Sequence, residues 1–174
     1  MAPNTPFLYY HIPSLSNMTI DVTKFLTKAH QTIPTFTGLK VTTLDFHEVY
    51  ECLAFEGKKL DVYYGGDTQL LPAFVMGVRA AIGHFYNFLG KEYNAMMEYY
   101  RKGDLDAARD IQMKISLDVW SLFKKYGVSV IKVMTSLVSG IDLGPNRLPM
   151  KHNFSEKEIH DIKNVLTKKG YLKE

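Results

Sequence analysis

Residues 1–90 alternate between short apolar runs and amphipathic segments, and this alternation constrains the fold more than any other feature of the sequence. The four apolar runs are residues 7–12, 35–42, 60–64 and 81–86. Strands that alternate with helices indicate parallel pairing through right-handed helical crossovers. The runs are short and apolar throughout, which is typical of a parallel sheet that is covered on both faces.

The segments between the runs carry apolar residues at helical spacing. The predicted helices are residues 19–31, with Thr19 or Asp21 as N-cap, residues 45–55, closed by Gly57, and residues 69–78. From residue 91 onward the pattern predicts helices without strands. These helices are residues 92–102, 105–126 and 128–138, followed by a last helix that starts with a capping box of Ser155 and Glu158.

Four β-α units are half of a closed barrel of eight, which has about 250 residues. The chain has 174 residues. We therefore predict an α/β fold with half of a TIM (β/α)8 barrel in residues 1–90. Residues 91–174 form a C-terminal helical extension that packs as part of the same domain. An open, four-stranded doubly wound sheet satisfies the same pattern.

The composition argues against several classes of protein. The net charge is +3 and the lysines are scattered, so we expect no nucleic-acid partner. The longest apolar region, residues 70–90, is interrupted by Pro72, Arg79 and His84, so we expect no membrane span. The single cysteine, Cys52, suits a reducing compartment. No basic-then-apolar leader precedes the first strand, and we predict a cytoplasmic protein.

Two strand-like runs carry residues suited to imine chemistry. Lys40 and Thr42 share one face of residues 35–42, and Tyr10 lies near the end of residues 7–12. Burial of the lysine amine favours its neutral form, which can attack a ketone to give a carbinolamine and then a Schiff base. A nearby phenol can move protons as a carbon–carbon bond breaks. The alternative is a surface lysine beside a core tyrosine.

Several segments together resemble the N-acetylneuraminate lyases, Schiff-base aldolases of the dihydrodipicolinate synthase-like superfamily that are built on a TIM barrel. The segments are Tyr-x-Ile-Pro-Ser-Leu-Ser at residues 10–16, Thr-Gly-Leu-Lys at 37–40, Ile-Gly-His-Phe-Tyr-Asn at 82–87 and Leu-Val-Ser-Gly-Ile at 137–141. The resemblance covers nearly the whole chain. The family's first-half motif, Gly-[Ser/Thr]-[Ser/Thr]-Gly-Glu, does not occur in the sequence. The resemblance therefore implies the second half of the barrel, as a truncated form of the enzyme.

By this resemblance, Lys40 forms a Schiff base with pyruvate, and Tyr10 is the proton donor and acceptor. Thr42 binds substrate. Gly65 and Asp67 match a Gly-x-Asp-Glu turn that holds the hydroxylated tail of the sugar acid. The implied reaction is cleavage of N-acetylneuraminate to N-acetylmannosamine and pyruvate, in sialic acid catabolism, by a homotetramer that uses no cofactor and no metal.

Two positions that would line the pocket depart from the family pattern. Thr68 replaces a glutamate and accepts fewer hydrogen bonds from a polyol, so a lyase for a shorter 2-keto-3-deoxy sugar acid is an alternative. His84 replaces a serine, and it fills the pocket, takes over the serine's contact or is a satisfied core histidine. Asp67 can also serve as the N-cap of the next helix.

A half barrel has a further consequence, because it leaves strand edges unpaired and exposes the apolar face of the sheet. We therefore expect the chain to associate with further protein. A non-catalytic half-barrel interaction module is the corresponding alternative to an enzyme.

Overall fold

The computed structural model describes residues 4–55, 60–150 and 153–172. Contacts group the chain into two compact units that divide after Gly83. The first unit, called the sheet unit, holds the four strands, and the second, called the helical unit, begins at His84. The division after residue 83 falls before the predicted boundary at residue 90. That both parts belong to one domain stays a prediction.

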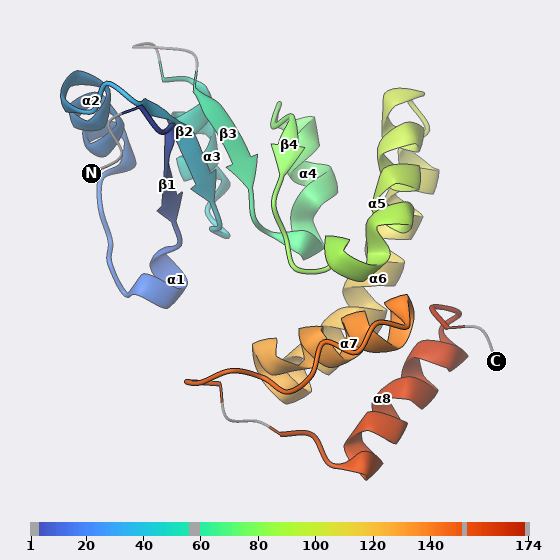
Figure 1. Cartoon of the computed structure of the whole chain (residues 1–174). Helices are drawn as coiled ribbons and strands as arrows, with labels where there is room; N and C mark the ends of the chain where they lie inside the picture. The colour runs from blue at the N-terminus through green and yellow to red at the C-terminus, as the bar shows by residue number, and fades with distance from the viewer. Residues whose placement is uncertain (1–3, 56–59, 151–152, 173–174) are drawn as a thin grey trace. The chain divides into compact units, whose positions relative to one another are not determined.

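The sheet unit contains four parallel strands in the order β1-β2-β3-β4, as the β-α alternation predicts (Figure 1). The strands are β1 (Phe7–His11), β2 (Phe36–Val41), β3 (Asp61–Tyr64) and β4 (Ala80–Ala81). Between them lie the helices α1 (Pro13–Ser16), α2 (Val22–Thr32), α3 (Phe46–Leu53) and α4 (Leu70–Val75), with a 3-10 turn, η1 (Asp67–Gln69), before α4. β1 and β4 are the edge strands of this sheet.

The helix caps follow from single side chains. The carboxylate of Asp21 accepts a hydrogen bond from the backbone N–H of Lys24, so Asp21 rather than Thr19 begins α2. Asp45 caps α3 in the same way. Gly57, predicted to close that helix, lies outside the described residues. The predicted helix over residues 69–78 is shorter, because Gly77 takes a left-handed φ of 108° and ends the segment.

The predicted fourth strand, residues 81–86, is wrong over most of its length. Only Ala80 and Ala81 pair with β3. The N–H of Ile82 still donates to the carbonyl of Tyr64, and the chain then leaves the sheet. Four residues later Tyr86 already begins a helix, at whose start the side-chain amide of Asn87 donates to the carbonyl of His84 (2.9 Å). This local bond stabilises a helical turn where the apolar composition indicated a strand.

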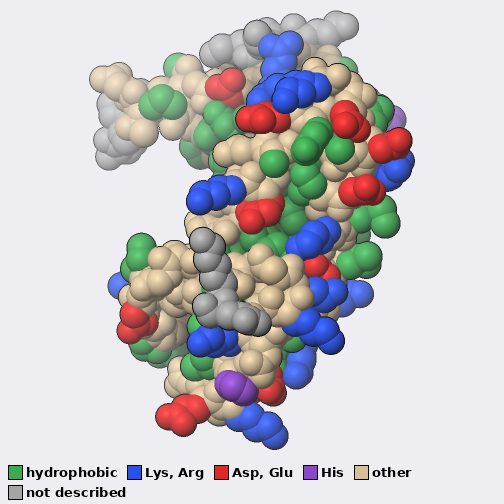
Figure 2. All heavy atoms as spheres, turned by 90° about the vertical axis from the view of Figure 1, so that its right-hand side faces the viewer, with side chains coloured by type: hydrophobic (Ala, Val, Ile, Leu, Met, Phe, Trp, Pro, Cys, Tyr) green, Lys and Arg blue, Asp and Glu red, His purple; other side chains and the backbone are tan. Residues whose placement is uncertain are grey.

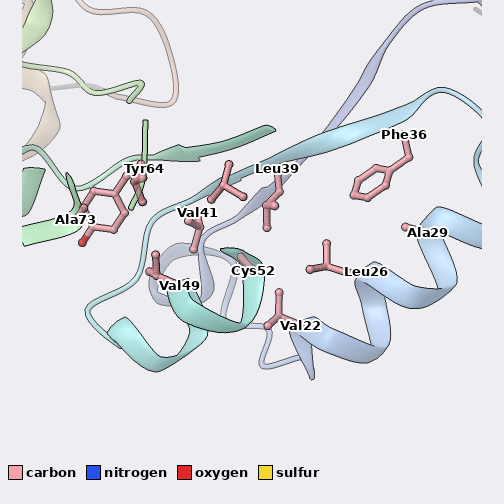
Figure 3. Close-up of a cluster of buried hydrophobic side chains, with 12 residues drawn as sticks. Val22, Leu26, Ala29, Phe36, Leu39, Val41, Val49, Cys52, Tyr64 and Ala73 are labelled. Atoms are coloured by element: carbon pink, nitrogen blue, oxygen red, sulfur yellow. The ribbon is translucent and has the colours of Figure 1, made fainter. Parts of the chain in front are cut away.

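The core of the sheet unit lies on one face of the sheet, against α2, α3 and α4 (Figure 3). Leu39, Val41 and Tyr64 point from the strands toward the helices, and Leu26, Val49 and Cys52 come from α2 and α3. On the opposite, open face, Leu8 and Tyr10 are 41% and 42% exposed. The predicted exposure of an apolar sheet face is therefore confirmed.

The helical unit comprises α5 (Tyr86–Arg101), α6 (Leu105–Tyr126), a 3-10 turn η2 (Gly127–Ser129), α7 (Val130–Ser139) and α8 (Glu156–Lys168). The bounds of α6 are those predicted from its apolar periodicity. α5 starts at Tyr86, ahead of the predicted helix over 92–102, and kinks at Leu89. The predicted capping box of Ser155 and Glu158 is confirmed at the start of α8.

Charged side chains of both signs stand among hydrophobic ones on the face that Figure 2 presents. This mixture agrees with the scattered lysines of the sequence. Across residues 4–55, 60–150 and 153–172, none of the helices combines the length and the apolar character that crossing a membrane requires.

In the helical unit, the buried carboxylate of Asp118 in α6 contacts Lys169 and Tyr171, which follow α8. Asp118 is 8% exposed, and its oxygens lie 2.7 Å from Lys169 Nζ and 3.6 Å from Lys114 Nζ. The hydroxyl of Tyr171 donates to the same carboxylate (3.5 Å). Burial and the nearby Asp118 charge together raise the pKa of Tyr171, which keeps this phenol protonated.

The substitution Asp118→Asn should lower the free energy of unfolding by about 1–2 kcal/mol, because it removes the charge that both lysines face. The loss should shrink at high salt, since Lys114 and Lys169 are half exposed and are screened. Urea denaturation at low and high salt measures both effects. As a control on the same helix, Asp110→Asn at an exposed site should change stability by less than about 0.5 kcal/mol. Equal effects of the two substitutions would contradict this account.

Candidate active site

Tyr10, Lys40 and Thr42 come together on the open face of the sheet. Tyr10 and Lys40 are direct neighbours in the parallel register of β1 and β2. The Lys40 ammonium nitrogen lies 4.2 Å from the centroid of the Tyr10 ring. The hydroxyl of Thr42 donates to the phenol oxygen of Tyr10 (3.3 Å). The structure thus brings Tyr10 beside Lys40 and Thr42, the two residues that strand alternation placed on one face, and the roles of all three stay predictions.

This arrangement has two chemical consequences. A cation over an aromatic face is stabilised by the ring's negative quadrupole, so the Tyr10 ring would also stabilise a positively charged imine at Lys40. The Tyr10 oxygen accepts from Thr42, which leaves the phenol's own proton available to a ligand. The cluster can therefore hold an iminium ion beside a proton donor.

Gly65 completes this cluster at the end of β3. Its N–H donates to the carbonyl of Val41 (2.8 Å), which brings the turn against β2. A Cβ at this position would overlap Thr42 Oγ1 and would lie 3.0 Å from Lys40 Cε. Glycine is therefore required for the close approach of this turn to the two side chains.

Asp67 and Thr68 follow Gly65 in the same turn. Asp67 is the first residue of η1 and is 8% exposed. Gly66 holds the N-cap position of η1 and Gln69 that of α4, and no side-chain hydrogen bond caps either, so the prediction that Asp67 is an N-cap is wrong. Thr68 is half-buried. Substrate binding by either residue stays a prediction.

His84 lies outside the sheet unit, at the start of the helical unit. Its side chain is exposed, and its ring centroid is 6.5 Å from that of Phe123. The alternative of a satisfied core histidine is therefore wrong. That His84 replaces a serine contact in the pocket stays a prediction.

Sequence reasoning missed two buried polar groups behind this face. The hydroxyl of Tyr64 lies 2.8 Å from Gln69 Oε1 and 3.1 Å from the carbonyl oxygen of Thr43. The buried His11 places Nε2 3.6 Å from Glu48 Oε2. The sequence feature that could have revealed them is a polar group at a core position of a strand, His11 in β1 and Tyr64 in β3, because such groups need partners when they are buried.

The fold and this cluster define an α/β protein of the TIM-barrel class with a lysine and a tyrosine paired at the ends of adjacent strands. The model of the Dihydrodipicolinate synthetase family matches residues 1–169. The chain belongs to this family.

Curated relatives include N-acetylneuraminate lyase of Mus musculus, 40% identical over 169 residues, which are 94% of this chain and 53% of the relative. N-acetylneuraminate lyase A of Xenopus laevis is 38% identical over 168 residues, 96% of this chain and 54% of the relative. The chain thus spans about half the length of the curated relatives it matches.

Solved structures show the same similarity. Proteus mirabilis N-acetylneuraminate lyase superposes with a TM-score of 0.91 at 30% identity, over 98% of this chain and 57% of that one. N-acetylneuraminate lyase from Fusobacterium nucleatum, complexed with pyruvate, gives 0.80 at 28% identity, over 97% of this chain and 55% of that one. These matches agree with the predicted half of a TIM barrel.

Proposed function

We propose that this chain carries the Schiff-base machinery of an aldolase-type lyase that cleaves N-acetylneuraminate to N-acetylmannosamine and pyruvate. The observation that carries the proposal is the position of Lys40 Nζ, 4.2 Å from the centroid of the Tyr10 ring, with Thr42 bonded to the phenol. The names of the relatives supply the substrate. No cofactor is needed, because an imine nitrogen itself withdraws the electron pair of the broken bond.

The proposed reaction begins at the Lys40 amine, which attacks the C2 ketone carbon and forms a carbinolamine. Tyr10 gives its proton to the departing water, which leaves an iminium ion and a phenolate. The phenolate accepts the proton of the C4 hydroxyl as the C3–C4 bond breaks, and the electron pair moves through C3 to the nitrogen. The aldehyde leaves, and Tyr10 protonates C3 of the enamine. Water then hydrolyses the imine, which releases pyruvate and restores both side chains.

The rest of the pocket would recognise the substrate. Thr42 lies beside both reacting groups, and Gly65 gives the turn access to them. We propose that Asp67 in this turn binds the hydroxylated tail. Thr68 supports a shorter 2-keto-3-deoxy sugar acid as an alternative substrate, because a threonine hydroxyl accepts fewer hydrogen bonds than a carboxylate. Comparing cleavage of acids with and without the glycerol tail distinguishes the two.

Two features bear on where and how the chain works. The open face with the exposed Leu8 and Tyr10, and the edge strands β1 and β4, support the proposal that the chain acts in association with further protein, as in the predicted homotetramer. Cys52 is a buried free thiol, and burial raises its pKa to about 12. An unreactive thiol of this kind is compatible with the proposed cytoplasmic location.

Borohydride trapping tests the proposal directly. The 174-residue chain is incubated with pyruvate, reduced and digested, and the peptides are examined by mass spectrometry. We expect a reduced pyruvate adduct on the peptide that contains Lys40, and none in samples without pyruvate or without borohydride. No adduct in a sample shown to be folded by circular dichroism would overturn the proposal, and the interaction-module alternative would then lead.

A further inference from the structure

Tyr64 is the last residue of β3 and is completely buried, yet its hydroxyl reaches two loops. The ring belongs to the core on the helix-covered face (Figure 3). Lys40 lies on the other face, because Tyr64 pairs with Val41, the next residue along β2. The phenol oxygen lies 2.8 Å from Gln69 Oε1 and 3.1 Å from the carbonyl oxygen of Thr43. A core position alone does not require a hydroxyl, so the two polar contacts call for a separate explanation.

The two contacts end on the two halves of the candidate pocket. Thr43 directly follows Thr42, which bonds to Tyr10. Gln69 is the last residue of η1, the turn that begins at Asp67. One phenol therefore connects the segment next to the Schiff-base lysine with the turn that carries the proposed tail-binding carboxylate.

The ring of Tyr64 also supports this turn by direct packing. A Cβ at Gly66 would lie 2.7 Å from Tyr64 Cε1 and 2.9 Å from its hydroxyl oxygen. The backbone of Gly66 therefore packs directly on the ring, at a distance that a larger residue would not permit.

The phenol keeps its proton throughout the working range of an enzyme. Burial raises the pKa of Tyr64 to about 12. The hydroxyl therefore stays a donor whose single proton is shared between the two acceptors, and the contact between the loops does not depend on pH near neutrality.

We infer that Tyr64 is a positioning residue, which ties the Thr42–Thr43 segment to the Asp67–Gln69 turn and so sets the spacing between the imine-forming and the sugar-binding parts of the pocket. This inference rests on the proposed function. It predicts that loss of the hydroxyl affects a long sugar acid, which needs both parts, more than pyruvate, which needs only the first.

The test is Tyr64→Phe in the 174-residue chain, which removes one oxygen and keeps the ring. The concentration of ligand that gives half-maximal borohydride trapping at Lys40 is measured separately for pyruvate and for N-acetylneuraminate. We expect about a tenfold increase for N-acetylneuraminate, the effect of one lost hydrogen bond, and a change below about twofold for pyruvate.

Two further variants separate positioning from general stability. Gln69→Met removes one acceptor of the phenol and should raise the same concentration about threefold, and the double variant should be no worse than Tyr64→Phe alone, because both act on one contact. Tyr9→Phe is the matched control. Tyr9 is a half-buried phenol that packs on Phe25 at the helix-covered face, and neither ligand should be affected by its loss.

Amide hydrogen exchange of the free protein reports the connection without any ligand. Residues 65–69 should exchange about fivefold faster in Tyr64→Phe than in the wild type, because the turn opens more often.

A higher half-maximal trapping concentration for N-acetylneuraminate alone, together with faster exchange, supports the positioning role. Equal shifts for both ligands, or none, overturn that role and leave the Schiff-base function standing. A wild-type chain that traps neither ligand overturns the proposed function, and with it the role of Tyr64 in substrate binding. If exchange of residues 65–69 is also unchanged in Tyr64→Phe, the structural connection between the two loops is overturned as well.

Discussion

Replacing Lys40 with methionine should abolish covalent trapping of pyruvate, because the unbranched thioether side chain, one atom shorter than lysine, has no amine to form an imine. The adduct on the peptide containing residue 40, read by mass spectrometry after borohydride reduction, should fall below detection. The fold should persist, since Lys40 lies on the open face of the sheet and the core lies on the other.

Two matched variants make this result specific. Lys40→Arg keeps a cation over the Tyr10 ring and should also trap nothing, which separates imine chemistry from the charge. Lys28→Met removes an exposed lysine from α2 and should trap as much pyruvate as the wild type. Undiminished adduct in Lys40→Met, carried by another lysine, would show that the predicted Schiff-base residue is wrong.

The substitution Gly38→Ala should cause the largest loss of stability in the sheet unit. Gly38 lies in the middle of the sheet, paired with Leu8 of β1 and Asp61 of β3. An added Cβ would overlap the backbone carbonyl of Asp61, which cannot turn aside as a flexible side chain can. The two strands would have to separate, and we expect the free energy of unfolding to fall by about 3 kcal/mol or more, measured by urea denaturation.

Gly90→Ala is the control for this prediction. Gly90 lies within α5, and the space around its Cβ position is open to 4 Å. Alanine is the better helix former, so this variant should gain about 0.5–1 kcal/mol. If Gly38→Ala unfolds within about 1 kcal/mol of the wild type, the close approach of β2 and β3 at this residue is not a constraint on the fold.

Much of the local structure could be predicted, because it depends on residues close together in the sequence. α6 has the predicted bounds, since a capping aspartate, Asp104, precedes a long apolar period. The capping box of Ser155 and Glu158 is formed by side chains three residues apart. In contrast, the short helix α1 lies outside every helix predicted from the sequence, although proline, here Pro13, is favoured at a helix start.

The candidate site divides in the same way. Strand alternation was enough to place Lys40 and Thr42 on one face, and the parallel register then set Tyr10 beside Lys40. The length of β4 was mispredicted because an apolar run does not show where pairing with a neighbour stops. Exposure of His84 could not be read from its type, since histidine occurs both inside and outside proteins.

The amino-acid sequence by itself therefore determined the β-α order, most of the caps and the shared face of Lys40 and Thr42, because period and capping are local properties of the chain. Tertiary structure alone decided three things: that Gly65 leaves room for Thr42, that Gly38 packs against the carbonyl of Asp61, and that the phenol of Tyr64 joins Thr43 to Gln69. Each is a contact between residues on different strands and loops. Such contacts depend on distances that only the packed sheet sets, and no spacing along the sequence encodes them.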